Sequence, residues 1–115
     1  MISLNPHGPL AVALLLGSLS LSSWTGDAHA GDPVAGKARA GMCATCHGAL
    51  GLSQLPNAPH LAGQPAIYLV EQLKNYRSGK RPNEMMGVIA KPLTDREIDD
   101  LAAWYESIQI SVVVK

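Results

Sequence analysis

Five consecutive residues, Cys43-Ala44-Thr45-Cys46-His47, have the types and spacing needed for covalent cofactor chemistry. Two thiols three residues apart can lie on the same side of one helical turn, where each can add to one vinyl group of a porphyrin. The adjacent His47 then lies beneath the ring, where a neutral imidazole nitrogen can bind iron. The C-x-x-C-H segment therefore predicts one covalent haem c, attached through Cys43 and Cys46, with His47 as the proximal iron ligand.

Two other chemistries also use closely spaced cysteines. A thioredoxin-like dithiol normally opens the helix of a βαβ unit, and no strand-rich segment surrounds this pair. A structural zinc site needs four ligands, but the only histidine after residue 30 besides that of the motif is His60. Both alternatives are therefore weaker than haem attachment.

Met85 and Met86 are the only methionines that follow the motif. A thioether is a soft, neutral ligand that can bind haem iron opposite a histidine and that favours the ferrous state. The residue types alone do not choose between the two side chains. Either one would close the second axial position, which argues against a haem sensor or peroxidase with an open distal site.

The segment over residues 48–59 is rich in glycine and proline, which predicts an irregular loop. A histidine that binds a metal usually donates its other ring N–H to a carbonyl, and this hydrogen bond fixes the tautomer and the ring orientation. Pro59 is the candidate for the carbonyl that orients His47. We expect the neighbouring His60 to be a solvent-facing loop residue rather than a second ligand.

Short helices must position these residues. Asp32 and Pro33 are typical of a helix start, and the run from Val34 to Met42 continues this helix with small residues that allow a close helix crossing. Apolar residues at helical spacing predict a second helix over 65–78 that stops at Gly79. The expected core face of this helix consists of Ile67, Leu69, Val70, Leu73 and Tyr76.

A capping box at Thr94 and Glu97 predicts the start of a last helix, which runs to about Ile108. The apolar residues expected on one face of it are Ile98, Leu101, Ala102, Tyr105 and Ile108. The tail over residues 110–115 is rich in β-branched residues and fits no helix. Packing on the surface, pairing as an edge strand and contact with a partner are all open for this tail.

The first thirty residues predict a leader rather than a part of the fold. Leu10–Leu21 is an apolar run shorter than the roughly 20 residues that span a bilayer, and an A-x-A cleavage site follows it and ends at Ala30. We therefore expect a signal peptide over 1–30, a single domain over 31–115 and a periplasmic location. An uncleaved membrane anchor is the alternative, because no Lys or Arg precedes Lys37.

Nine basic and nine acidic residues leave the chain formally neutral, whereas a nucleic-acid partner usually needs a strongly basic face. We therefore expect no nucleic-acid binding. A domain this small often needs a cofactor to complete its core. Haem would supply an apolar plate around which short helices pack, so we expect the protein without haem to be poorly folded.

Three blocks of sequence together resemble the class I cytochromes c, and particularly the single-domain relatives of cytochromes c4 and c553. These blocks are GKARAGMCATCHG, PHLAGQPAIYLVEQLKNYRSGKRPNEMM and LTDREIDDLAAWY, and the resemblance covers essentially all of residues 31–108. The first block is generic to c-type haem proteins, whereas the L-A-G-Q and S-G-x-R segments of the second are more specific. The resemblance implies the small all-α class I cytochrome c fold, with N- and C-terminal helices that cross near the haem, here Gly36 to Ala40 against Trp104.

The resemblance also assigns the site residue by residue. The two thioether cysteines, the proximal ligand, the proline that provides the carbonyl and the distal methionine fall on Cys43, Cys46, His47, Pro59 and Met86. The family pattern places the methionine three residues after the Asn of the R-x-N segment, which favours Met86 over Met85.

The function implied by the resemblance is electron transfer in the periplasm, by a one-electron carrier with a His/Met-ligated c-type haem and no enzymatic activity of its own. The alternative is a haem c subunit of an oxidoreductase complex, with a dehydrogenase or a sulfur-compound oxidising partner. Either function needs redox partner proteins, a donor and an acceptor that the sequence does not identify. Cytochromes c4 have two such domains, so with one domain any transfer between haems would require a partner.

Overall fold

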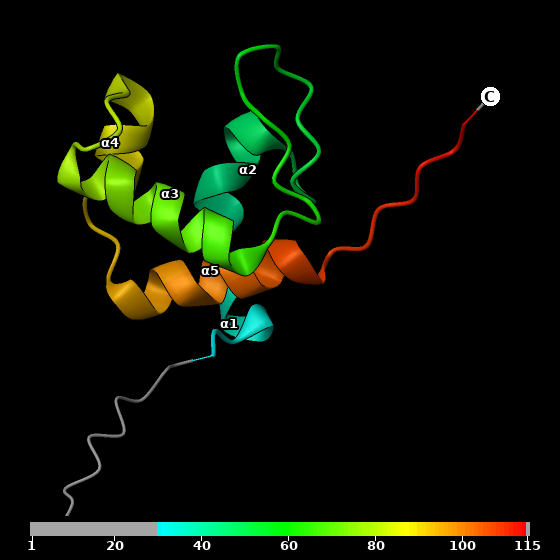
Figure 1. Ribbon diagram of the computed structural model, residues 1–115, viewed down its shortest axis with the longest axis horizontal. Coiled ribbons are helices and arrows are strands. Elements are labelled where there is room, and N and C mark those ends of the chain that lie inside the picture. The colour runs from blue at the N-terminus through cyan, green and yellow to red at the C-terminus, as the bar shows by residue number, and fades with distance from the viewer. Residues whose placement is uncertain (1–29, 115) are drawn as a thin grey trace, which may run out of the picture.

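The computed structural model describes residues 30–114, where the chain forms helices without any strand (Figure 1). The predicted all-α class is confirmed. The helices are, in order, α1 (Pro33–Arg39), α2 (Gly41–His47), α3 (Ala66–Ser78), α4 (Glu84–Ala90) and α5 (Asp95–Ser107). Apart from Ala30, the expected signal peptide lies outside the described residues. Within residues 30–114, every helix is too short or too polar to cross a membrane.

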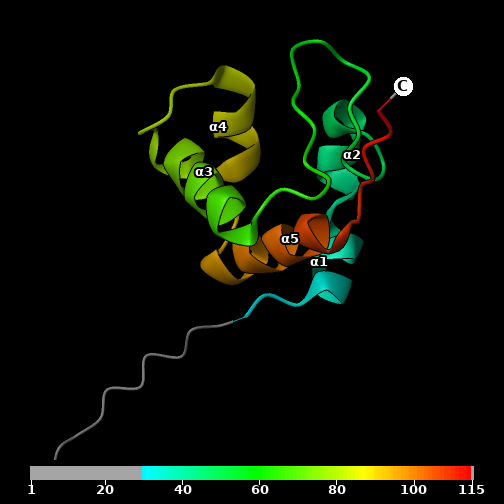
Figure 2. The same cartoon turned by 45° about the vertical axis from the view of Figure 1, so that its right-hand side comes forward.

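The first predicted helix is two helices in the structure. Asp32 caps α1 as expected, because its side chain accepts a hydrogen bond from the backbone N–H of Val34 at 2.8 Å. The chain then turns at Ala40, which is buried against the core, and α2 begins at Gly41. The expectation of one continuous helix up to Met42 is wrong, since a glycine with weak helix preference next to a buried alanine allows a bend there. This bend turns the C-x-x-C-H segment away from the axis of α1 (Figure 2).

Gly36 lies where α1 crosses α5. A Cβ atom at this position would lie 1.9 Å from the backbone oxygen of Asp100 and 2.9 Å from the Cβ of Trp104, so only glycine lets the helices approach this closely. The backbone N–H of Asp32 also donates a hydrogen bond of 2.7 Å to the Asp100 carboxylate. The predicted crossing of Gly36 to Ala40 against Trp104 is therefore confirmed.

α5 begins at the predicted capping box. The Thr94 hydroxyl accepts a hydrogen bond from the backbone N–H of Glu97 at 3.2 Å, and the Glu97 carboxylate accepts one from the Thr94 N–H at 2.8 Å. The helix packs against both α1 and α3. Among the helices of residues 30–114, α5 contributes the largest share of the buried core, with Ile98, Leu101, Ala102 and Tyr105. The predicted last helix is confirmed to within one residue of its end.

α3 agrees with the prediction to within one residue and ends at Gly79, whose φ of 80° gives the left-handed cap. Its predicted core face is only partly right. Leu69 is buried and both Leu73 and Tyr76 pack against the core, but Ile67 is 82% exposed. The physical reason is helical geometry, because two residues correspond to about 200° around the axis, so Ile67 and Leu69 lie on nearly opposite sides.

α4 is absent from the sequence prediction, which expects only a region broken by proline around the two methionines. Asn83 starts this helix, since its side-chain oxygen accepts a hydrogen bond from the backbone N–H of Met86 at 2.9 Å. α4 packs against α3, whereas α2 packs against α1. As a result, α2 with its following loop and α4 stand on opposite sides of the molecule, above α3 and α5 (Figure 1, Figure 2).

Beyond α5, residues 109–114 continue without helix or strand, as expected from their composition. Ile110 lies near Gly63, where a Cβ atom would be 3.2 Å from the isoleucine side chain. The three valines that follow are 81–89% exposed. Of the three arrangements left open for the tail, a strand pairing within the described residues is thus not formed.

Candidate haem site

α2 holds both cysteines and the histidine of the motif within two helical turns. Cys43 and Cys46 have free, half-buried thiols, and His47 is the last residue of the helix and is 7% exposed. Gly48 then takes a φ of 84°, and a Cβ atom there would lie 2.2 Å from the backbone oxygen of Leu52. Glycine at this position lets the chain reverse directly after the histidine and return beneath it.

The returning loop contacts the imidazole. His47 Nδ1 lies 2.8 Å from the carbonyl oxygen of Pro59. Because a carbonyl oxygen can only accept, Nδ1 must carry the hydrogen, which leaves the lone pair on Nε2. The expected hydrogen bond is present in the structure, and it gives the tautomer that a ligand to haem iron requires. The role of both residues at haem remains a prediction.

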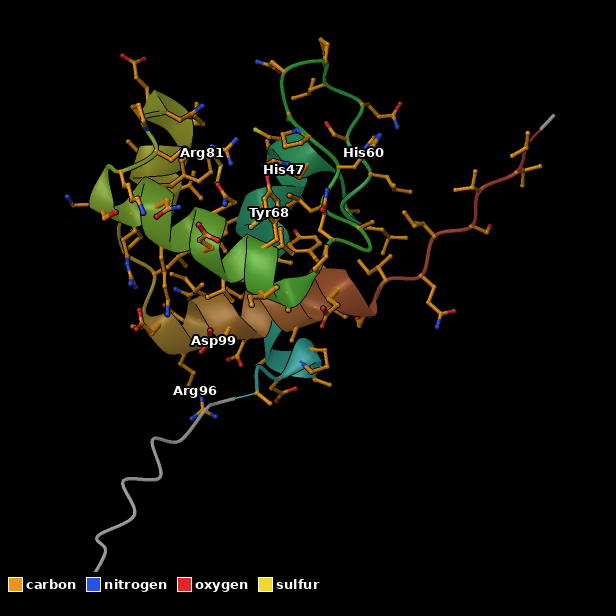
Figure 3. All side chains as sticks on the ribbon, viewed as in Figure 1. His47, His60, Tyr68, Arg81, Arg96 and Asp99 are labelled. Atoms are coloured by element: carbon orange, nitrogen blue, oxygen red, sulfur yellow. The ribbon has the colours of Figure 1, made fainter. Side chains whose placement is uncertain are left out.

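Two further residues fix the loop that carries Pro59. The hydroxyl of the buried Ser53 donates a hydrogen bond of 2.9 Å to the carbonyl oxygen of Cys46, and the backbone N–H of Ser53 donates one of 2.8 Å to His60 Nδ1. His60 is exposed on the loop, as expected (Figure 3). It therefore ties the loop together next to Pro59, a role that no spacing in the sequence indicates.

The two methionines of α4 differ in burial. Met85 is 62% exposed, whereas Met86 is only partly exposed. Consecutive residues are about 100° apart around a helix, so the two thioethers cannot both face the same side. The hydrogen bond from the Met86 N–H to Asn83 places Met86 in the first turn, across the molecule from α2.

The Cys43 side chain packs against the core cluster, which includes Tyr105. Burial raises the pKa of this thiol, and the nearby Tyr105 hydroxyl offsets part of the increase. Burial also raises the pKa of Tyr105, and the Cys43 thiol adds to that shift. Among the described residues, the Tyr105 hydroxyl and the Trp104 indole N–H are the buried side-chain polar atoms that form no hydrogen bond.

The donor atoms fit haem c. α2 supplies two thiols for the porphyrin vinyl groups and an imidazole Nε2 lone pair for iron. α4 supplies a partly buried thioether from the opposite side of the molecule, and α2 and α4 are each held by a different neighbour, α1 and α3. These residues could hold haem between the two helices.

Comparison with known proteins places the chain in a family. Residues 33–109 match the family model described as Cytochrome c. Cytochrome c4 of Pseudomonas aeruginosa is 47% identical over 105 residues, which cover 90% of this chain and 50% of that protein. Cytochrome c-554(548) of Halomonas halodenitrificans is 42% identical over 81 residues, which cover 68% of this chain and 98% of that protein.

Two further matches agree with this family. A thiosulfate dehydrogenase electron acceptor of Stutzerimonas stutzeri is 42% identical over 105 residues, which cover 89% of this chain and 48% of that protein. The crystal structure of reduced cytochrome c4 from Pseudomonas stutzeri superposes with a TM-score of 0.68 at 37% identity, over 72% of this chain and 48% of that one. The chain thus spans about half the length of the cytochromes c4 that it matches. It belongs to the cytochrome c family, as a class I c-type cytochrome of the c4 type with covalently bound haem c.

Proposed function

We propose that this chain is a periplasmic one-electron carrier whose single haem c is attached through Cys43 and Cys46. In this proposal His47 and Met86 are the axial ligands, and residues 31–115 are one haem domain without enzymatic activity of its own. The observation that supports it most is the 2.8 Å hydrogen bond between His47 Nδ1 and the Pro59 carbonyl oxygen. That bond orients the imidazole and leaves Nε2 for iron.

Electron transfer is the function of the family, and the side chains of the site suit it. Haem supplies the one-electron iron couple when bound. His47 and Met86 would close both axial positions, so no substrate would bind at the iron and no ligand would need to move during transfer. Pro59, held in place by the loop contacts of Ser53, would keep the imidazole in one orientation in both oxidation states.

The choice of Met86 over Met85 is supported by burial. Met85 is 62% exposed and would leave solvent only if the first turn of α4 rotated, which the Asn83 cap opposes. Met86 is partly buried and needs no such rotation. A thioether at the sixth position also stabilises the ferrous state, as a carrier with a high potential requires.

The experiment compares Met86→Ala with Met85→Ala in haem-loaded protein. Oxidised wild-type protein should show the weak near-infrared band that arises from a sulfur–iron bond, and should bind little CO when reduced. Met86→Ala should lose the band, lower the potential and bind CO, because the sixth position becomes open. Met85→Ala is the matched control and should retain all three wild-type properties.

Two results would contradict the proposal. Loss of the band in Met85→Ala alone would make Met85 the ligand. Rapid CO binding by the wild-type protein would show an open distal site and would favour a sensor or a peroxidase over a carrier.

A second candidate function is a haem subunit of an oxidoreductase complex. It is favoured by relatives that are named thiosulfate dehydrogenase electron acceptors, in Stutzerimonas stutzeri and Thiomonas intermedia. Both functions need redox partner proteins, and purification from the native host separates them. A diffusible carrier should be purified from the periplasmic fraction without a bound partner, with Gly31 as its first residue. A subunit should remain bound to its partner through gel filtration.

A further inference from the structure

Three hydrogen bonds form a closed network at the end of α2. His47 Nδ1 donates to the Pro59 carbonyl oxygen at 2.8 Å. The Ser53 hydroxyl donates to the Cys46 carbonyl oxygen at 2.9 Å, and the Ser53 backbone N–H donates to His60 Nδ1 at 2.8 Å. Cys46 and His47 are neighbours in the chain, as are Pro59 and His60, so two peptide bonds close the network. Its one side-chain acceptor is the imidazole of His60.

The contact between Ser53 and His60 requires one form of the imidazole. A backbone N–H can only donate, so His60 Nδ1 must carry a lone pair, and in the neutral imidazole the hydrogen then lies on Nε2. Ser53 is 7% exposed, and a buried backbone N–H without a partner costs free energy. The position of the loop therefore depends on an acceptor at residue 60.

Backbone hydrogen bonds hold the chain on the other side of His60. The Gly51 carbonyl oxygen accepts the N–H groups of Leu61 and Ala62 at 2.7 and 3.1 Å. These bonds fix the residues that follow His60, whereas Pro59 precedes it. The His60 side chain thus connects Ser53 to the peptide that presents the Pro59 carbonyl oxygen to His47.

We propose that His60 positions the Pro59 carbonyl group and thereby tunes the reduction potential of the haem through His47. The inference rests on the proposed binding of His47 to iron. A firm hydrogen bond from Nδ1–H to a carbonyl raises the basicity of a histidine ligand. A more basic ligand donates more electron density, which stabilises ferric over ferrous iron. The closed network therefore lowers the potential, and His60 is a positioning residue that neither gains nor loses an electron or a proton.

His60→Phe tests this inference in haem-loaded protein. It removes the acceptor and keeps an aromatic side chain at an exposed position, so the fold should be retained. Redox titration should show the equilibrium shifted about threefold toward the reduced form, which is about 30 mV higher at about 59 mV per tenfold for one electron. His60→Asn is the matched control, because its side-chain oxygen can accept the Ser53 N–H in place of Nδ1. It should retain the wild-type potential.

Hydrogen exchange measures the network itself, through the NMR signal of the His47 Nδ1–H in reduced protein. This hydrogen exchanges with water when its bond to the Pro59 carbonyl oxygen opens. Loss of one hydrogen bond of ordinary net strength should make the opening about fivefold to tenfold more frequent, so the exchange should accelerate by that factor in His60→Phe. His60→Asn should exchange at the wild-type rate.

Three results would overturn the inference. The first is an unchanged or lower potential in His60→Phe. The second is faster exchange with an unchanged potential, which would give His60 a purely structural role. The third is an equal effect of His60→Phe and His60→Asn, which would show that an acceptor at residue 60 is not what matters.

Failure of the proposed ligation gives a different result. The ring protons of His47 in the reduced wild type are shifted strongly by the porphyrin only if the imidazole lies on the iron. Unshifted protons would refute the binding of His47 itself. Shifted protons, together with a potential that does not respond to His60→Phe, would refute only the role of His60.

Discussion

Gly36 has no side chain, and this allows α1 and α5 to pack in direct contact. The atom that replaces a glycine hydrogen there would overlap backbone atoms of Asp100, which cannot move aside as a flexible side chain would. Gly41, only five residues away, has nothing within 4 Å of the corresponding Cβ position. These two glycines therefore have different roles, although they look alike in sequence.

Gly36→Ala should destabilise the protein by about 1–3 kcal/mol or more, because the two helices must separate to admit the methyl group. Gly41→Ala is the matched control and should be neutral or stabilising by up to about 1 kcal/mol, since alanine favours the helix. Thermal unfolding of both haem-loaded variants measures the difference. Equal stability of the two variants would show that α1 and α5 have room for a methyl group at position 36.

At the scale of elements, acidic side chains in the first turn of α5 pair with basic side chains of other helices. Glu97 accepts the backbone hydrogen bond of Thr94 and forms an ion pair of 2.7 Å with Arg39 of α1. Asp95 accepts a hydrogen bond from Arg77 and lies 3.6 Å from Lys74, both on α3. The first turn of α5 thus links this helix to α1 through Glu97 and to α3 through Asp95.

These contacts make the stability of the fold depend on pH in the acidic range. The backbone hydrogen bond at Thr94 lowers the pKa of Glu97, and the Arg77 hydrogen bond lowers the pKa of Asp95. A carboxylate with a lowered pKa stabilises the fold above its unfolded pKa of about 4, and the contribution is lost as pH falls through the folded value. Glu97→Gln should therefore reduce stability at neutral pH and flatten its decline in acid, whereas Glu71→Gln, exposed on α3, should change neither. A steeper decline in Glu97→Gln would contradict this assignment.

Sequence patterns that act over a few residues are sufficient to predict much of the fold and of the site. Asp32, Gly79 and the Thr94 box each act within one helical turn, so the sequence predicts them directly. The break at Ala40 and the exposure of Ile67 depend on which neighbours cover each side chain, which local spacing does not encode. The contact of His47 with Pro59 follows from ligand chemistry, but Ser53 and His60 stabilise it through contacts that only the folded loop creates.

For the whole molecule, the helices that carry the expected ligands pack on different neighbours. α2 is held by α1, α4 is held by α3, and the two stand on opposite sides (Figure 1). Several large apolar side chains on α4 and on the loop after α2 are exposed, among them Leu50, Leu52, Leu55, Met85 and Val88. A small chain with this much exposed apolar surface needs a further apolar body to complete its core, and haem provides one.

The double variant Cys43→Ala and Cys46→Ala, which cannot attach haem, should therefore be poorly folded. Its helical circular dichroism should be weaker than that of the haem-loaded protein and should lose its cooperative thermal transition. Met85→Ala keeps both cysteines and the proposed ligands, and it serves as the control for a substitution that leaves haem attachment intact. A double variant that unfolds cooperatively at the wild-type temperature would show that the helices hold together by themselves.

The contact between α1 and α5 also sets an order of events during folding. Asp32 and Asp100, which share a hydrogen bond across this contact, are 68 positions apart in the chain. Contacts between such distant segments form late, because the long intervening chain must first be closed into a loop. A polypeptide that emerges from its N-terminus onward therefore presents Cys43 and Cys46 before α5 exists to pack against α1. Both thiols are thus open to chemistry before the last helix completes the core.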